Sequence, residues 1–270
     1  MNLHNTPEMI LNPYRFAGGG GGTYNLLTNA SAAYSLINLD ASFSGAVCRV
    51  RNATSSGSLD YTAAEILDGT LVADLAGDAG EIDRLYDQSG NGQTMIADSG
   101  SEQPRLVTSG VVKTRDGFPV IDFESYTSSG FNGASGHELS TLYLAGERTS
   151  SSNNGLAKNT GGGALGDLFS SSTVVSFDGS GSVKGAVALN GGTFTADAEN
   201  VSFTTTLDVH SLWVYRFETG EAFTNNEAYN GRSGVDPYEG YSHCFIAYPE
   251  SAQSADSDIR SAINTLFSIY

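Results

Sequence analysis

The sequence is short of positive charge and contains very few cysteines. Lysine and arginine together number 13 against 30 aspartates and glutamates, which leaves a formal net charge of −17. A surface this acidic repels phosphate backbones, so the composition argues against binding to nucleic acid. Cys48 and Cys244 are too few for a disulfide framework or for a zinc site of their own. Their apolar surroundings predict buried free thiols.

Long apolar runs and a secretory leader are also missing. No stretch reaches the roughly 18 consecutive apolar residues that cross a bilayer, so we expect no membrane span. The first eleven residues carry His4 and Glu8 where a secretory signal needs a basic end and an apolar stretch, so no such signal is predicted. The four histidines are widely spaced and form no paired motif, and each is expected to be structural. The sequence therefore predicts neither a metal site nor a cofactor.

The first 22 residues differ from the rest of the chain. Tyr14, Arg15 and Phe16 are followed closely by five consecutive glycines at positions 18–22. A glycine run has no side chains to pack, so it uncouples the segment before it from the residues after it. We predict an N-terminal arm and tether over residues 1–22 and one globular domain over 23–270. The arm is expected to dock on a neighbouring subunit, and a frayed terminus is the alternative.

Short apolar runs separated by glycine-rich turns dominate from residue 24 onward. Residues 46–51 alternate between two faces, and further runs lie at 174–177, 183–189, 201–207, 212–217 and 241–248. This pattern predicts an all-β antiparallel sandwich or barrel. Two short helices are expected as well. One follows Thr62 and Glu65, which have capping-box spacing, and is interrupted at Gly69; the other covers residues 254–267.

The string Tyr86-Asp-Gln-Ser-Gly-Asn-Gly92 is the most distinctive in the chain. Asp87 can accept hydrogen bonds from the amides that follow it, and Gly90 permits a positive φ. We interpret Asp87, Ser89, Gly90 and Asn91 as a structural turn at a strand end. The alternative is a carboxylate held for a ligand or for calcium, although the spacing is not that of an EF-hand.

Several strings occur in a characteristic order: Phe43-Ser-Gly-Ala46, Arg49-Val-Arg51, the Tyr86–Gly92 string and residues 103–112. The series resembles the concanavalin A-like (LamG-type) β-sandwich domains of phage structural proteins. Those domains are similar in turn to the catalytic domain of fungal α-L-arabinofuranosidase B. The resemblance implies a two-sheet antiparallel jelly roll and a place among virion proteins.

The same resemblance bears on catalysis. A retaining glycosidase needs two carboxyl groups about 5 Å apart. The position nearest the family's glutamate nucleophile holds Asp167, one place out of register. The position nearest its acid holds Asp236, which precedes proline where the family has asparagine. We therefore expect no enzyme activity, and keep Asp167 and Asp236 as catalytic candidates under a hydrolase alternative.

Aromatic side chains are the remaining resource for ligand binding. Trp213, Tyr215 and Phe217 alternate on one strand face, which is typical of a core. Tyr238 and Tyr241 flank Glu239 in a polar stretch, so these three are the better exposed candidates for a sugar. A lone pair of tyrosines is weak evidence for a site, and packing in the core or at its rim is the favoured interpretation of both.

The sequence as a whole favours a virion structural protein that displays a lectin-like sandwich on a phage head or tail. Its expected place is the virion surface, and its expected ligand is a glycan on the host surface. The arm would contact other virion proteins, and a homo-oligomer, with a trimer as the first guess, would hold identical copies together. A glycoside hydrolase of the α-L-arabinofuranosidase type and a purely architectural capsid cement protein are the alternatives.

Overall fold

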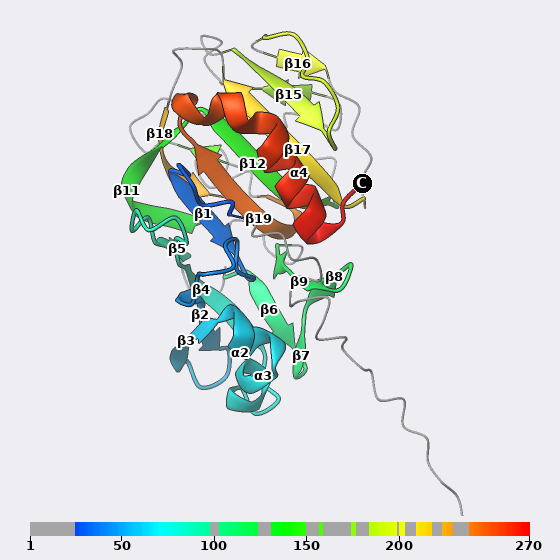
Figure 1. Ribbon diagram of the computed structural model, residues 1–270. Helices are drawn as coiled ribbons and strands as arrows, with labels where there is room; N and C mark the ends of the chain where they lie inside the picture. The colour runs from blue at the N-terminus through cyan, green and yellow to red at the C-terminus, as the bar shows by residue number, and fades with distance from the viewer. Residues whose placement is uncertain are drawn as a thin grey trace, which may run out of the picture.

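A computed structural model describes residues 25–97, 103–123, 131–149, 157–158, 174–176, 184–198, 200–202, 209–217, 223–228 and 238–270. One continuous sheet path joins most of the described strands, and their pairings are antiparallel (Figure 1). Its strands are β1 (Ala32–Ser35), β2 (Ala46–Asn52), β3 (Ser58–Thr62), β4 (Gly80–Leu85), β5 (Met95–Ala97), β6 (Arg105–Thr108), β7 (Val111–Val112), β10 (Ile121–Asp122), β11 (Phe131–Leu139), β12 (Thr141–Arg148), β13 (Ala157–Lys158), β15 (Gly185–Leu189), β17 (Ser211–Phe217), β18 (Phe223–Ala228) and β19 (Gly240–Tyr248).

The path has two halves that meet where β6 pairs with β10. Strands β13, β18, β11, β5 and β4 follow one another in the first half, and β19, β12, β17 and β15 in the second. Strands β2 and β3 extend the first half beside β4, while β1 pairs with β19 in the second. Two short pairs stand apart from the path: β8 (Thr114–Arg115) with β9 (Phe118–Pro119), and β14 (Val174–Ser176) with β16 (Asn200–Ser202).

The main core lies between the two halves. Val50 of β2 and Leu85 of β4 belong to one apolar cluster with Leu144 of β12 and Trp213 of β17, and all four are buried. Tyr215 and Phe217 join the same cluster, so the core role expected from the alternation of residues 213–217 is confirmed. One face of each half thus contributes to a shared core, which makes the fold an antiparallel β-sandwich, as the sequence predicted.

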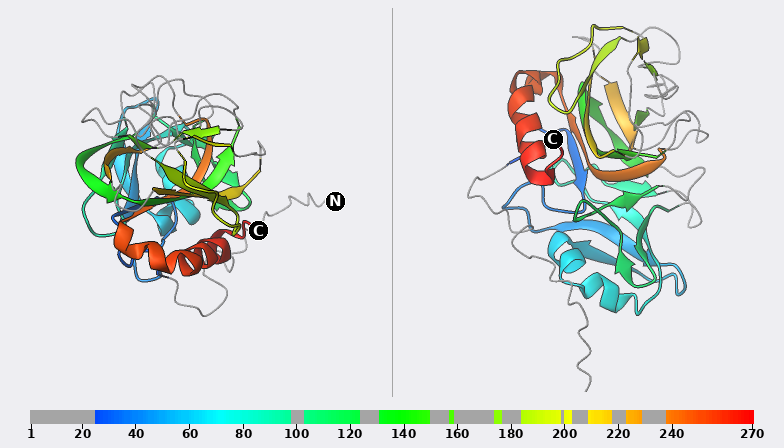
Figure 2. Two further views of the ribbon diagram at one scale, coloured as in Figure 1. Left: turned by 90° about the horizontal axis from the view of Figure 1, so that it is seen from above. Right: turned by 90° about the vertical axis from the view of Figure 1, so that its right-hand side faces the viewer.

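A second core covers the outer face of the β19–β12–β17 half. There α4 (Asp256–Phe267), preceded by a 3-10 helix (Glu250–Ala255), lies against one face of the sheet (Figures 1 and 2). Ile259, Ile263 and Phe267 are buried against that face. The Tyr143 hydroxyl also donates a hydrogen bond to Asp256 at 2.7 Å. The predicted terminal helix is confirmed, and its apolar spacing is what docks it.

The first helical segment is confirmed as a pair, α2 (Ala63–Leu67) and α3 (Thr70–Asp74). Thr62 and Glu65 form the predicted capping box, in which the Glu65 carboxylate accepts from the Thr62 amide at 2.8 Å. Gly69 separates the helices at a φ of +92°, a conformation that favours glycine.

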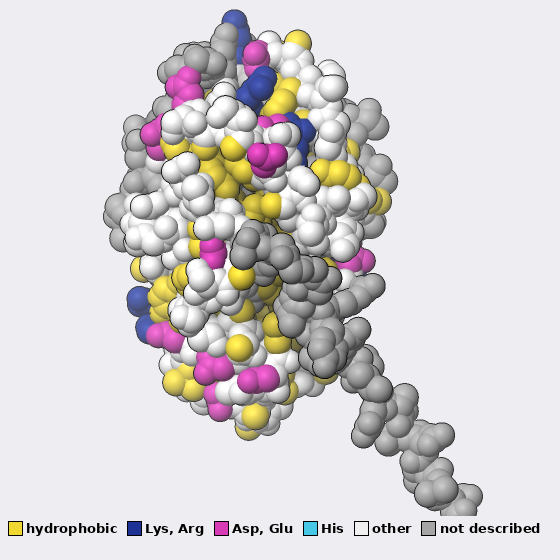
Figure 3. All heavy atoms as spheres, in the orientation of Figure 1, with side chains coloured by type: hydrophobic (Ala, Val, Ile, Leu, Met, Phe, Trp, Pro, Cys, Tyr) yellow, Lys and Arg dark blue, Asp and Glu magenta, His cyan; other side chains and the backbone are white. Residues whose placement is uncertain are grey.

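The acidic surface and the buried thiols are those that the composition predicts. Acidic side chains are scattered over the face shown in Figure 3, from the α2–α3 end of the molecule to the opposite end. Cys48 and Cys244 are free and buried, as expected, and burial raises the pKa of Cys244 to about 12. Among the helices of the described residues, none is long and apolar enough to cross a membrane.

Candidate functional sites

The Tyr86–Gly92 string ties three segments together. One Asp87 carboxylate oxygen accepts from the amides of Ser89 and Ala33, each at 2.9 Å. The other accepts from the Ser89 hydroxyl at 2.8 Å and from the Gln93 amide at 3.2 Å. Gly90 has a φ of +85°, and the Asn91 amide group donates to the Ala30 carbonyl at 2.8 Å. These hydrogen bonds therefore close the turn and fix it to β1 and to the residues that precede β1.

Gln88, which the sequence analysis did not single out, adds buried hydrogen bonds to this turn. It is buried, its amide group donates to the carbonyls of Ser35 and Ile37, and its oxygen accepts from the Leu39 amide at 2.9 Å. Because the polar atoms of Asp87 and Gln88 bind backbone groups and the Ser89 hydroxyl, these contacts provide structural support.

The two tyrosines named as the better exposed sugar candidates are buried, which agrees with the favoured packing interpretation and not with exposure. Tyr238 is 0% exposed and Tyr241 4%. The Tyr238 ring packs edge-on against Phe123, and its hydroxyl donates to the Glu147 carbonyl at 3.0 Å. The Arg115 guanidinium covers the Tyr241 ring at 4.0 Å from its centre. Glu239 between them is partly exposed, and sugar binding by the three residues stays a prediction.

Beside Tyr238, an arginine is buried on the inner side of the sandwich. Arg148 ends β12 and has no exposed surface. Burial lowers the pKa of its guanidinium, while the neighbouring phenol groups of Tyr215 and Tyr238 favour the charged form. Trp213 is buried in the same core, and all four side chains have interaction partners. None of the four side chains is more than 1% exposed, so the group is part of the core in this structure.

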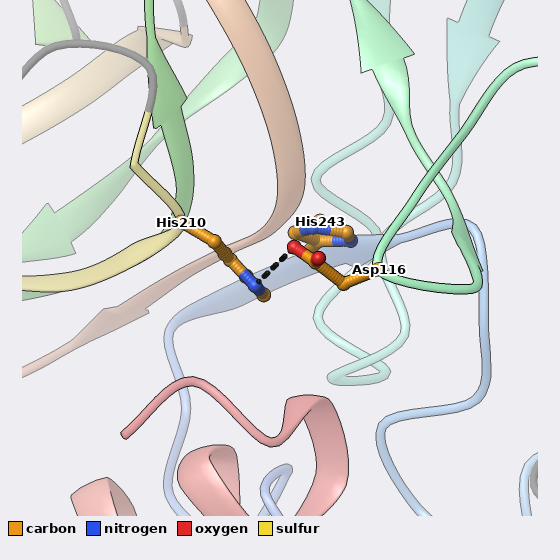
Figure 4. A group of neighbouring side chains, drawn as sticks. All are labelled: Asp116, His210 and His243. Carbon is orange, nitrogen blue, oxygen red and sulfur yellow. Dashed lines mark ion pairs between the residues drawn. The ribbon is translucent and has the colours of Figure 1, made fainter.

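A third group joins residues that are far apart in the sequence. Asp116 lies between β8 and β9, His210 precedes β17, and His243 belongs to β19. One ligand atom from each lies within 4.8 Å of the others. His210 Nδ1 is 3.0 Å from Asp116 Oδ2, and the two imidazole ring centres are 4.3 Å apart. Figure 4 shows both imidazoles beside the Asp116 carboxylate.

Local backbone features bring these three side chains together. Asp116 and Gly117, with φ values of +51° and +85°, form the two-residue turn that joins β8 to β9. In the pairing of β19 with β12, Ala145 faces Cys244 and Gly146 faces Ser242, so His243 is an extra residue in a β-bulge.

The bulge decides which way His243 points. Without it, alternation would place His243 on the inner face with Phe245; instead its ring packs on the α4 side, 5.3 Å from that of Phe267. Burial lowers the pKa of both imidazoles, for His210 against the opposing influence of Asp116 and for His243 with a further contribution from His210. Burial therefore favours the neutral form of both rings. Sequence spacing carries no sign of this group, because its members meet only in the folded sheet.

Several sequence-predicted residues lie outside the described residues. They are the catalytic candidates Asp167 and Asp236 and the arm residues Tyr14, Arg15 and Phe16. Their predicted roles stay predictions.

No protein-family model and no curated protein matches the chain. Solved structures do, over 88% of the chain with a TM-score of 0.51. They include an arabinofuranosidase complexed with arabinofuranosyl-α-1,2-xylobiose at 14% identity and a GH54 α-L-arabinofuranosidase soaked with a cyclic sulfate inhibitor, also at 14%. A mutant GH54 enzyme soaked with 4-nitrophenyl α-L-arabinofuranoside is 15% identical.

The match concerns the fold. The chain spans 62% to 63% of the length of these neighbours. Because the sequence identity is only 14% to 15%, the structural similarity shows a shared fold and no more. The concanavalin A-like fold implied by the sequence resemblance is thereby supported.

Proposed function

We propose that this chain recognises α-L-arabinofuranosyl groups of glycans on its β-sandwich. The observation that carries the proposal is the match of 88% of the chain to solved structures of arabinofuranosidases, one of them with an arabinofuranosyl xylobiose bound. Recognition of this sugar would be needed for attachment to a glycan and for its hydrolysis.

The inner side of the sandwich supports the proposal. Arg148, Trp213, Tyr215 and Tyr238 form a polar and aromatic group there, and Tyr238 fixes the segment that follows Asp236 in the sequence to the end of β12. Arg148 is a positioning residue in this proposal, because it is buried and acts through its neighbours. Because none of these four side chains is more than 1% exposed, they would support the wall of a sugar site from behind and would not contact the sugar themselves.

Equilibrium titration with arabinofuranosyl-α-1,2-xylobiose tests recognition, with xylobiose as the matched ligand without the arabinofuranosyl group. We expect binding of the first and none of the second. Arg148→Lys should weaken binding because it keeps the charge and loses the planar fork. Arg84→Lys, at a partly exposed arginine of β4, is the control. Equal binding of both ligands, or of neither, would contradict the proposal.

Hydrolysis of the arabinofuranoside is the second candidate function, favoured because the matching structures are themselves glycosidases. The resemblance offers Asp167 and Asp236 as its two carboxyl groups. Release of 4-nitrophenol from 4-nitrophenyl α-L-arabinofuranoside is the assay. Asp167→Asn and Asp236→Asn should each abolish the release, with Asp197→Asn, at an exposed aspartate, as the control. Binding without turnover would leave recognition as the function.

The virion setting is a separate proposal, which rests on the order of the sequence strings. In it the sandwich is displayed on a phage surface and the arm of residues 1–22 joins it to other virion proteins. Glycan recognition fits that setting as a means of attaching to a host. Detection of the chain in purified virions by mass spectrometry would support the setting, and its absence from them would contradict it.

A further inference from the structure

The Asp116–His210–His243 group has the donor set of a metal site. Two neutral imidazoles and one carboxylate are ligands that first-row transition metals accept, and zinc is bound by such sets with a further position open to water. The residues come from the β8–β9 turn, the start of β17 and the bulge of β19, so only the folded chain presents them together.

Unsatisfied ring nitrogens point to a ligand at this place. His243 is 1% exposed, and among the residues that the structure describes neither of its ring nitrogens has a hydrogen-bond partner. The Pro119 carbonyl lies near the ring without meeting hydrogen-bond geometry. His210 Nε2 is also buried and unpartnered within the described part of the chain. A buried imidazole with no partner costs free energy, and a bound cation would offset that cost.

The surroundings fit an ion that enters from one side. Phe118 and Phe267 pack against the His243 ring, with ring centres 6.0 and 5.3 Å from it, so the side of the group that faces the second core is apolar. The Asp116 side chain is 57% exposed at the tip of its turn, which leaves an approach from solvent. The neighbouring Arg115 already covers the Tyr241 ring and lies 3.8 Å from a Glu147 carboxylate oxygen, so its charge is partly compensated.

We propose that Asp116, His210 and His243 bind a divalent transition-metal ion of the zinc class. Ligand atoms around tetrahedral zinc lie about 3.4 Å apart, given bond lengths near 2.1 Å. The present spacing of up to 4.8 Å is wider, so the three side chains would have to draw together by about an ångström around a bound ion. Bound metal would join the β8–β9 hairpin to β17 and β19 and so stabilise the fold.

Titration of the chelator-treated full chain with Zn²⁺, followed by calorimetry and by thermal unfolding, tests the proposal. We expect one ion per chain and a rise in melting temperature. Asp116→Asn should weaken binding at least about tenfold and remove the rise, while asparagine tolerates the positive φ of the turn. His243→Phe, which suits the aromatic surroundings, should do the same.

Two controls keep the result specific to this group. Asp197→Asn removes an exposed carboxylate elsewhere and should bind like the unaltered chain. Co²⁺ in place of Zn²⁺ should give the absorption bands of a tetrahedral or five-coordinate site, and both ligand variants should lose them. Absence of stoichiometric binding by the unaltered chain would overturn the proposal, and so would binding that survives both ligand substitutions.

Discussion

Asp87 serves two parts of the molecule at once, because its carboxylate accepts from its own turn and from the amide of Ala33 in β1. Asp87→Ala leaves those amides without their acceptor, so we expect the free energy of unfolding to fall by about 2 kcal/mol. Urea denaturation measures the change. Asp197→Ala, at an exposed aspartate, should have almost no effect. Unchanged stability of Asp87→Ala would show that the turn does not depend on this carboxylate.

A second prediction about a single residue concerns Asp60. The Arg49 guanidinium holds the pKa of the Asp60 carboxyl below its usual value, against the effect of burial, and the Tyr86 hydroxyl adds to the lowering. Since the folded pKa is lower than the unfolded one near 3.9, the interaction stabilises the fold above about pH 4. This contribution disappears as the pH falls through the folded pKa.

The size of that effect is small because the Asp60 side chain is 44% exposed. We expect Asp60→Asn to cost about 0.5 kcal/mol at neutral pH and less at about pH 3. Urea denaturation at both pH values measures the difference between the two proteins. A difference that is the same at both would contradict the assignment.

At the scale of single elements, two glycines should respond very differently to alanine. A Cβ on Gly69 meets nothing within 4 Å, so Gly69→Ala pays only for its positive φ, about 1 kcal/mol. A Cβ on Gly146 falls against the Tyr241 carbonyl and the Tyr238 hydroxyl, so Gly146→Ala has to move β12 from β19. We expect it to cost about 3 kcal/mol. Thermal unfolding of both variants measures the two costs. An equal loss of stability in the two would show that close strand approach is not the constraint at Gly146.

The elements also show how far sequence reasoning reaches. The capping box at Thr62, the break at Gly69 and the apolar stripe of α4 are local patterns, and the structure bears out all three. The strand that ends the sandwich was expected over 241–248, yet no local signal announces the bulge at His243. Its cause is the register between β19 and β12, which depends on residues about a hundred positions away.

The candidate sites show the same division. Residues of the Tyr86–Gly92 string are close in sequence, and the predicted turn could be argued from their side chains alone. The burial of Tyr238 and Tyr241 could not be argued in this way, because it depends on Phe123, Glu147 and Arg115, which come from distant parts of the chain. Arg148 and the Asp116–His210–His243 group were missed for the same reason.

At the scale of the whole molecule, the arm remains a prediction about assembly. Removal of residues 1–22 should leave the melting temperature unchanged, because the glycine run at 18–22 is predicted to uncouple the arm from the domain. The truncated chain should fail to form oligomers or join particles, as judged by light scattering and by incorporation into virions. Loss of the thermal transition would place the arm in the domain's own core, and undisturbed assembly would make it a frayed end.

The claim that the chain recognises an arabinofuranosyl group is tested by a crystal structure of the chain soaked with arabinofuranosyl-α-1,2-xylobiose. We predict electron density for the arabinofuranosyl ring on the inner side of the sandwich, at the end of β12 marked by Arg148 and Tyr238. Density only at a lattice contact, or none at a ligand concentration that saturates binding in solution, would contradict the claim.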